Sequence, residues 1–162
     1  MDLSGLKWPI IIAVIAGLGW LVSSGGQNWI EKKVLNYTVS ENEDLNKANE
    51  KALSNLGGFF IKTMRYERGI RVLRTSIDRY GEDGANYYFN IYRCSRTYEA
   101  LGDSTANREK QVENYTMALG MLKFLIDNNA HSIDDRVPEV DVLRLRATDI
   151  AENNNLGEIG QF

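Results

Sequence analysis

Twenty-three consecutive residues near the amino terminus, from Trp8 to Ile30, carry no formal charge. A transmembrane helix needs about 20 apolar residues to cross about 30 Å of hydrocarbon. The 21 residue steps from Trp8 to Trp29, at about 1.5 Å rise each, would separate the two tryptophans by about 31 Å along a helix. Because indole rings favour the membrane–water interfaces, both tryptophans are candidate interface residues. The stretch therefore predicts a single-pass transmembrane anchor within residues 1–35.

Small residues recur along one face of this stretch. Their helical spacing would let a second transmembrane helix approach closely, so they are candidates for intramembrane helix packing. They are Ala16, Gly19, Ser23 and Gly26. Two alternatives stay open, namely a buried helix of a globular domain and a cleaved signal peptide with small residues near Ser24.

The charges that flank the stretch bear on localisation. Lys32 and Lys33 follow it, and the positive-inside rule then favours a cytoplasmic folded domain. Single-span proteins with a very short leader often have the opposite orientation. We expect a single-pass protein of a bacterial inner membrane, with the side of the folded domain open and a lean towards the periplasm.

The remaining residues are acidic and contain one cysteine. With Lys7 and Asp2 set aside, 18 basic and 21 acidic residues remain, and the net charge of the whole chain is −3. This balance argues against nucleic acid as a partner, because phosphate neutralisation needs a basic surface. Cys94 alone excludes an intramolecular disulfide and any multi-cysteine metal site.

Helical periodicity dominates after residue 44 and predicts an all-α fold. Ser40 and Glu43 have capping-box spacing at the end of a linker over 36–44. No sustained alternation of apolar and polar residues predicts a strand. The predicted inward stripes are Leu45, Ala48, Ala52, Leu56, Phe60; Tyr66, Ile70, Leu73, Ile77, Tyr80; Tyr88, Ile91, Cys94, Tyr98, Leu101; Tyr115, Ala118, Leu122, Leu125; and Val140, Leu143, Ala147, Ile150.

Two helix pairs carry similar residue types at similar spacing. The first pair has Leu53, Leu56, Gly57, Phe60, Gly69, Leu73 and Ser76, and the second has Ile91, Cys94, Ser95, Tyr98, Ala118, Leu122 and Leu125. With an insertion over 103–113, residues 45–128 resemble two tetratricopeptide repeats, and 138–153 resembles a further first helix or a capping helix. The resemblance implies an array of antiparallel helix pairs over 45–153 and a tail over 154–162. A plain helical bundle is the alternative.

Residues that could carry catalysis are few. His131 lies in a polar, turn-rich segment near Asp134 and Asp135, which predicts a solvated loop. Cys94 falls on an inward face and is expected in the core. Neither a nucleophile–base constellation nor a phosphate-binding glycine loop is present. We expect no enzyme activity, no cofactor and no metal.

The resemblance also implies a groove lined by the first helix of each pair. Ser54 and Gly58 do not supply the clamp with which some family members bind a terminal carboxylate, so we expect no such activity. Aromatic and arginine side chains, which are enriched in interface hot spots, would line the groove instead. The predicted protein-binding residues are Lys62, Phe89, Tyr92, Arg93 and Arg96.

These observations predict a membrane-anchored scaffold that acts as an assembly or accessory subunit of a membrane protein complex. Its expected partners are other subunits, bound through the anchor and the groove, and membrane lipid. A membrane-tethered chaperone or quality-control factor is one alternative. A homo-oligomer that organises a lattice is the other.

Overall fold

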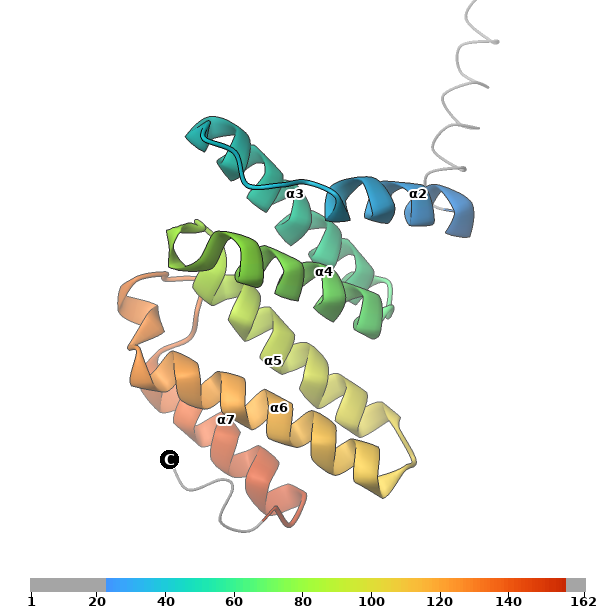
Figure 1. Cartoon of the computed structure of the whole chain (residues 1–162). Coiled ribbons are helices and arrows are strands. Elements are labelled where there is room, and N and C mark those ends of the chain that lie inside the picture. The colour runs from blue at the N-terminus through green and yellow to red at the C-terminus, as the bar shows by residue number, and fades with distance from the viewer. Residues whose placement is uncertain (1–22, 157–162) are drawn as a thin grey trace, which may run out of the picture. The chain divides into compact units, whose positions relative to one another are not determined.

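The computed structural model describes residues 23–156, which divide into two units between Tyr37 and Thr38. The described residues form six α-helices and two short 3-10 helices, and no strand occurs among them. The prediction of an all-α fold is confirmed. Figure 1 shows the helices in chain order, and each unit is described by itself below.

The described part of the first unit is helix α2 (Ser24–Leu35). It has its own N-cap at Ser23, which has extended backbone and whose hydroxyl accepts a hydrogen bond from the Gly26 N–H at 3.3 Å. Because the Ser23 backbone is extended, Ser23 is not part of a helix that continues unbroken to Ile30, as the predicted anchor requires. The last two turns of α2 also contain Glu31, Lys32 and Lys33.

Within residues 23–156, every helix is too short or too polar to cross a membrane. This finding contradicts the predicted localisation in a bacterial inner membrane as a single-pass protein. Trp8, Ala16 and Gly19 lie outside the described residues. Ser23, Gly26 and Trp29, which were also predicted to serve the anchor, belong to α2 and its cap, where the Trp29 ring lies 5.2 Å from the Lys33 ammonium.

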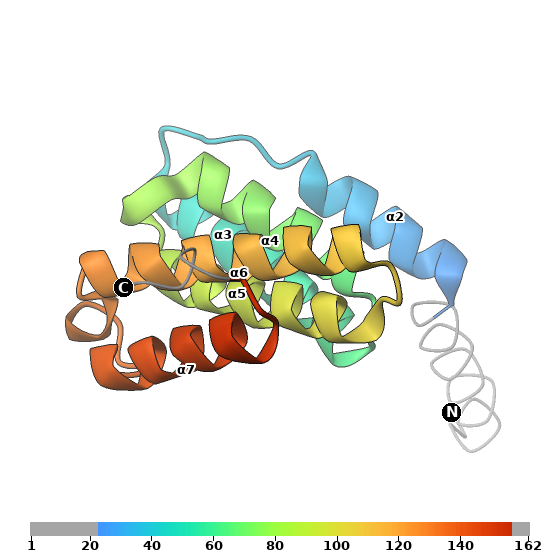
Figure 2. The same cartoon turned by 90° about the horizontal axis from the view of Figure 1, so that it is seen from below.

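The second unit is a series of helices in which each packs on the next along the chain. Figures 1 and 2 show this order from α3 to α7, with α7 at one edge. The elements are α3 (Glu43–Lys62), α4 (Tyr66–Tyr80), η2 (Gly81–Asp83), α5 (Tyr87–Ser104), α6 (Arg108–Asp127), η3 (Ala130–Ser132) and α7 (Val140–Asn153).

The ends of α3 follow local rules. Asn42, and not Ser40, is the N-cap, because its side chain accepts the Leu45 N–H at 3.1 Å. The predicted capping box between Ser40 and Glu43 is therefore wrong. At the other end, Met64 has a positive φ of 59°, and the Arg65 N–H bonds back to the Phe60 carbonyl at 2.8 Å. This Schellman-type turn reverses the chain into α4.

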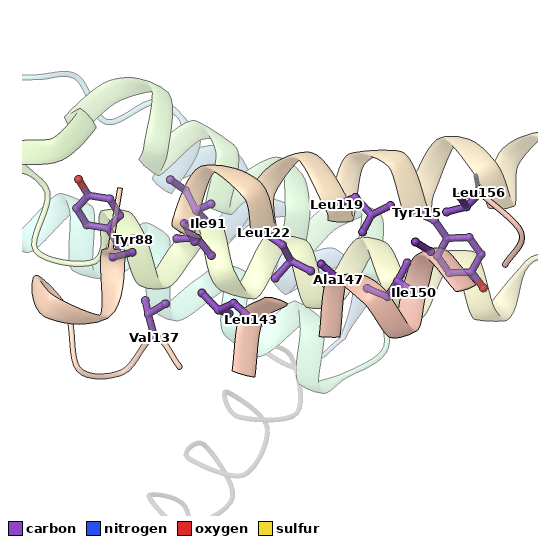
Figure 3. Close-up of a cluster of buried hydrophobic side chains, with 13 residues drawn as sticks. Tyr88, Ile91, Tyr115, Leu119, Leu122, Val137, Leu143, Ala147, Ile150 and Leu156 are labelled. Atoms are coloured by element: carbon purple, nitrogen blue, oxygen red, sulfur yellow. The ribbon is translucent and has the colours of Figure 1, made fainter. Parts of the chain in front are cut away.

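An apolar core fills the space between α5, α6 and α7 (Figure 3). Tyr88 and Ile91 enter it from α5, and Leu143 enters from α7. Leu156, beyond the end of α7, packs on the same cluster. The inward faces predicted for α6 and most of α7 are thus confirmed: Tyr115, Ala118, Leu122, Leu125, Leu143, Ala147 and Ile150 are buried.

Helices α3 and α4 cross at two glycines. A Cβ on Gly57 would collide with the Leu73 side chain, and one on Gly69 would lie 3.1 Å from the Gly57 carbonyl. The predicted stripe of α3 is wrong at its start, since Leu45 is 48% exposed, and is confirmed at its end, since Phe60 is fully buried. Leu53, which lies outside the predicted stripe, is also fully buried. The buried face of α3 is therefore rotated relative to the predicted one.

Candidate functional site

A row of polar and small residues on α3 faces α5. Glu50, Ser54 and Gly58 are spaced by four residues and share one side of the helix, and all three are buried. The Glu50 carboxylate accepts two hydrogen bonds from Asn86, from its backbone N–H at 3.0 Å and from its side-chain amide at 2.7 Å. The amino-terminal end of α5 is thereby held against the first half of α3.

The next turn of α3 joins three helices through buried hydrogen bonds. The Ser54 hydroxyl donates to the side-chain carbonyl of Asn90 on α5 at 2.8 Å. The Asn90 amide in turn donates to the Ser76 hydroxyl of α4 at 3.3 Å. All three side chains are almost completely buried, and the Asn90 amide group is the polar partner that the two serine hydroxyls share.

Arg93 lies across the third position of the row. Its Nη1 donates to the Ser54 carbonyl at 2.9 Å and to the Ser54 hydroxyl at 3.3 Å. A Cβ on Gly58 would collide with Nη2 of Arg93, so the guanidinium occupies space that is open because residue 58 has no side chain. Phe89, one turn earlier on α5, has its ring centroid 5.4 Å from the same group.

The Arg93 guanidinium is a partly desolvated cation. Burial lowers the pKa of Arg93, and the positive charge of Arg136 lowers it further. Among residues 23–156, no carboxylate forms an ion pair with it. Arginine stays protonated in proteins, so a positive charge lacking a counter-ion is held at this position.

A hollow opens beside Arg93 where α3, α4 and α5 meet. Ile61 comes from the end of α3, and Tyr66 begins α4. The other lining residues, Arg93, Arg96, Thr97 and Ala100, come from α5. The lining combines apolar and aromatic surface with two guanidinium groups, and it includes no acidic residue.

Arg96 is the more exposed of the two arginines. Its Nε lies 3.8 Å from Glu99, and its side chain is 45% exposed. Both oxygens of Glu99 are bound by Arg146 of α7, at 2.6–2.9 Å. Glu99 is therefore engaged chiefly by α7 and holds Arg96 only weakly.

Arg136 is a residue that the sequence did not single out. It lies in the loop before α7 and donates to the Ala85 carbonyl and the Asn86 side chain, both at 2.7 Å. Its guanidinium also lies 4.8 Å from the Phe89 ring centroid. Phe89 thus contacts two guanidinium groups. The nearby Asp134 carboxylate pairs with Arg136 at 2.8 Å, and hydrogen bonds from Arg136 outweigh burial and lower the pKa of Asp134.

The five predicted groove residues fall into different environments. Arg93 and Arg96 share the hollow, and Lys62 is exposed in the position after Ile61. Phe89 is half-buried, and its ring contacts the guanidinium groups of both Arg93 and Arg136. Tyr92 packs against the apolar core between α5, α6 and α7.

Cys94 and His131, the residues considered for catalysis, belong to different elements, α5 and η3. Cys94 is fully buried, and burial raises the pKa of its thiol to about 12. His131 lies in η3, where its Nδ1 is 2.7 Å from the Val137 carbonyl. In the part of the chain that the structure describes, no group of three His, Cys, Asp or Glu side chains has metal-site geometry.

Comparison of the chain with protein-family models, with characterised proteins and with solved structures gives no match.

Proposed function

We propose that residues 38–156 form a protein-interaction module that acts as a scaffold or accessory subunit of a protein complex. The observation that carries the proposal is the hollow beside Arg93, in which three helices present Ile61, Tyr66 and two arginines to a partner. Arginine and tyrosine are the side-chain types that most often dominate interface energetics. The tetratricopeptide-like spacing of the helix pairs supports the same function, because arrays of this kind use helix faces for recognition.

The proposed partners are proteins that reach this hollow. Purification of the protein with its partners distinguishes three cases. The protein can be recovered with another subunit in a fixed ratio, with a mixture of weakly bound clients, or with a second copy of itself. A scaffold or accessory subunit requires the first of these. The proposed function includes neither a membrane anchor nor contact with lipid.

Site-specific photocross-linking in the native cells tests the proposal. A photoreactive amino acid at position 62 lies next to the hollow, and one at the exposed position Thr116 of α6 is the matched control. We expect position 62 to cross-link to one protein in a fixed ratio and position 116 not to do so. Equal cross-linking from both positions, or none from position 62, would contradict the proposed function.

A further inference from the structure

The hollow has a chemical bias that goes beyond protein binding in general. Its two charged lining residues, Arg93 and Arg96, are both cationic, although the chain as a whole has a net charge of −3. A cationic patch on a protein of net negative charge favours a partner that presents negative charge to it.

The structure also fixes the position of one of these charges. Arg93 is held by the Ser54 carbonyl and hydroxyl through Nη1, and it rests against Gly58 where any side chain would displace it. A guanidinium immobilised before binding loses little further freedom when it pairs with a carboxylate. Arg96, whose one ion pair among residues 23–156 is the contact of 3.8 Å to Glu99, can turn towards the same ligand.

The rest of the lining is apolar. Ile61, Tyr66 and Ala100 surround the arginines, so a ligand that is only a small anion would leave this surface unused. A peptide with an acidic side chain beside an aliphatic or aromatic one matches both parts. Planar carboxylates suit arginine because two parallel N–H···O bonds can form.

We propose that the hollow binds an acidic segment of a partner protein, in which an Asp or Glu side chain pairs with Arg93 and Arg96 and an adjacent apolar side chain packs on Ile61 and Tyr66. This inference rests on the proposed function and names the chemistry of the partner at the same site.

Selection from a random peptide library displayed on phage tests the inference with the full chain as bait. We expect the enriched peptides to contain Asp or Glu next to an apolar residue. The double variant Arg93→Gln/Arg96→Gln should bind those peptides at least about tenfold more weakly, since ionic hydrogen bonds of this kind are strong. The control Lys123→Gln/Arg144→Gln removes the same charge from exposed sites outside the hollow and should stay within about twofold of wild type.

Further variants separate recognition from folding. Arg93→Lys keeps the charge but not the planar fork and should retain part of the affinity. Circular dichroism and thermal unfolding of each variant report whether the fold persists. If Arg93→Gln/Arg96→Gln unfolds, the same comparison is made with Arg96→Gln alone, which should weaken binding and has no buried contact to lose.

The outcomes distinguish this inference from the proposed function. Enrichment of neutral peptides whose binding is lost in Ile61→Asp would overturn the acidic partner and leave a protein-binding hollow in place. Enrichment of basic peptides, or equal loss of binding in the control, would also overturn it. Failure to enrich any peptide would overturn it as well, and the proposed function would then depend on cross-linking through position 62.

Discussion

Two adjacent glycines of α3 face different neighbours. Gly57 meets the side chain of Leu73 on α4, whereas Gly58 meets the guanidinium of Arg93 on α5. On the α4 side, the missing Cβ lets two helices cross closely around apolar residues. On the α5 side, it makes room for a charge. The same residue type thus serves packing on one face of α3 and the placement of a functional group on the other.

The difference extends along the whole helix. The α4 side includes the fully buried Leu53 and Phe60, which stabilise the fold by removing apolar surface from water. The α5 side carries Glu50 and Ser54, whose hydrogen bonds chiefly replace bonds to water and add less net stability. We therefore expect substitutions on the first side to change stability most and those on the second to change binding most.

Gly57→Leu is the most severe test of the apolar side. The new side chain would collide with Leu73 and force α3 and α4 apart, which we expect to destabilise the fold by about 3 kcal/mol or more. Urea unfolding followed by circular dichroism measures this. Gly120→Leu is the matched control, because Gly120 of α6 has no atom near the place of its Cβ and should tolerate the change. Equal stability of the two variants would show that α3 and α4 do not cross at Gly57.

Asn90→Ala tests the polar side at the point where it joins three helices. The substitution leaves the buried hydroxyls of Ser54 and Ser76 without their common partner, and we expect a loss of about 2 kcal/mol. A triple variant, Asn90→Leu with Ser54→Ala and Ser76→Ala, removes the three polar side chains together, leaves Arg93 its bond to the backbone carbonyl of residue 54, and should recover part of the loss. A triple variant less stable than Asn90→Ala alone would argue against an unsatisfied network as the cause.

The thiol of Cys94, the residue after Arg93, should make the stability of the fold depend on pH. Its pKa of about 12 in the folded chain lies above the ordinary thiol value, so the folded state holds the proton more tightly. The stabilisation is complete below about pH 8.5, the unfolded value, and is lost as pH rises towards 12, by about 1.4 kcal/mol per pH unit. Denaturation between pH 8 and 10 should show a steeper decline for wild type than for Cys94→Ala. Parallel curves would contradict this assignment.

Met64→Gly should give the smallest change and the opposite sign. Met64 adopts a φ of 59°, which glycine accepts without the steric penalty of a side chain. Its side chain is 78% exposed, so little packing is lost. We expect a gain of about 0.5–1 kcal/mol in thermal or urea unfolding. Destabilisation would mean that the Met64 side chain contributes to the turn.

The helical class and the later helices could be predicted because their apolar residues recur with a helical period. The face of α3 could not be predicted in the same way, because only two of its six buried residues, Leu53 and Phe60, are large and apolar. Glu50, Ser54 and Gly58 do not resemble core residues in a sequence. The cap at Asn42 competed with an equally acceptable Ser40–Glu43 pattern. The N-cap at Ser23 likewise has no signal that distinguishes it from a small residue on a helix face.

The candidate site was predictable only in part. The tetratricopeptide resemblance implies that Arg93 and Arg96 lie on the groove side of their helix, and arginine is common in interfaces. The spacing does not reveal that Tyr92 packs against the apolar core, since that depends on the position of α6 and α7. Arg136 acts from a loop 50 residues beyond Asn86, and contacts of that kind arise from tertiary structure alone.

The most direct measurement compares Gly57→Ala with Gly58→Ala in the same two assays, urea unfolding and affinity for the acidic peptide that wild type selects best. Both variants gain helix propensity worth about 1 kcal/mol. Gly57→Ala should still be destabilised by about 1–2 kcal/mol, because Leu73 must shift, and should bind normally while folded. Gly58→Ala should keep wild-type stability within about 1 kcal/mol, because the flexible end of Arg93 can move away. Its peptide affinity should fall about tenfold. Equal destabilisation by the two substitutions, or unchanged affinity in Gly58→Ala, would contradict the claim that the α4 side of α3 stabilises the fold and the α5 side positions Arg93 for binding.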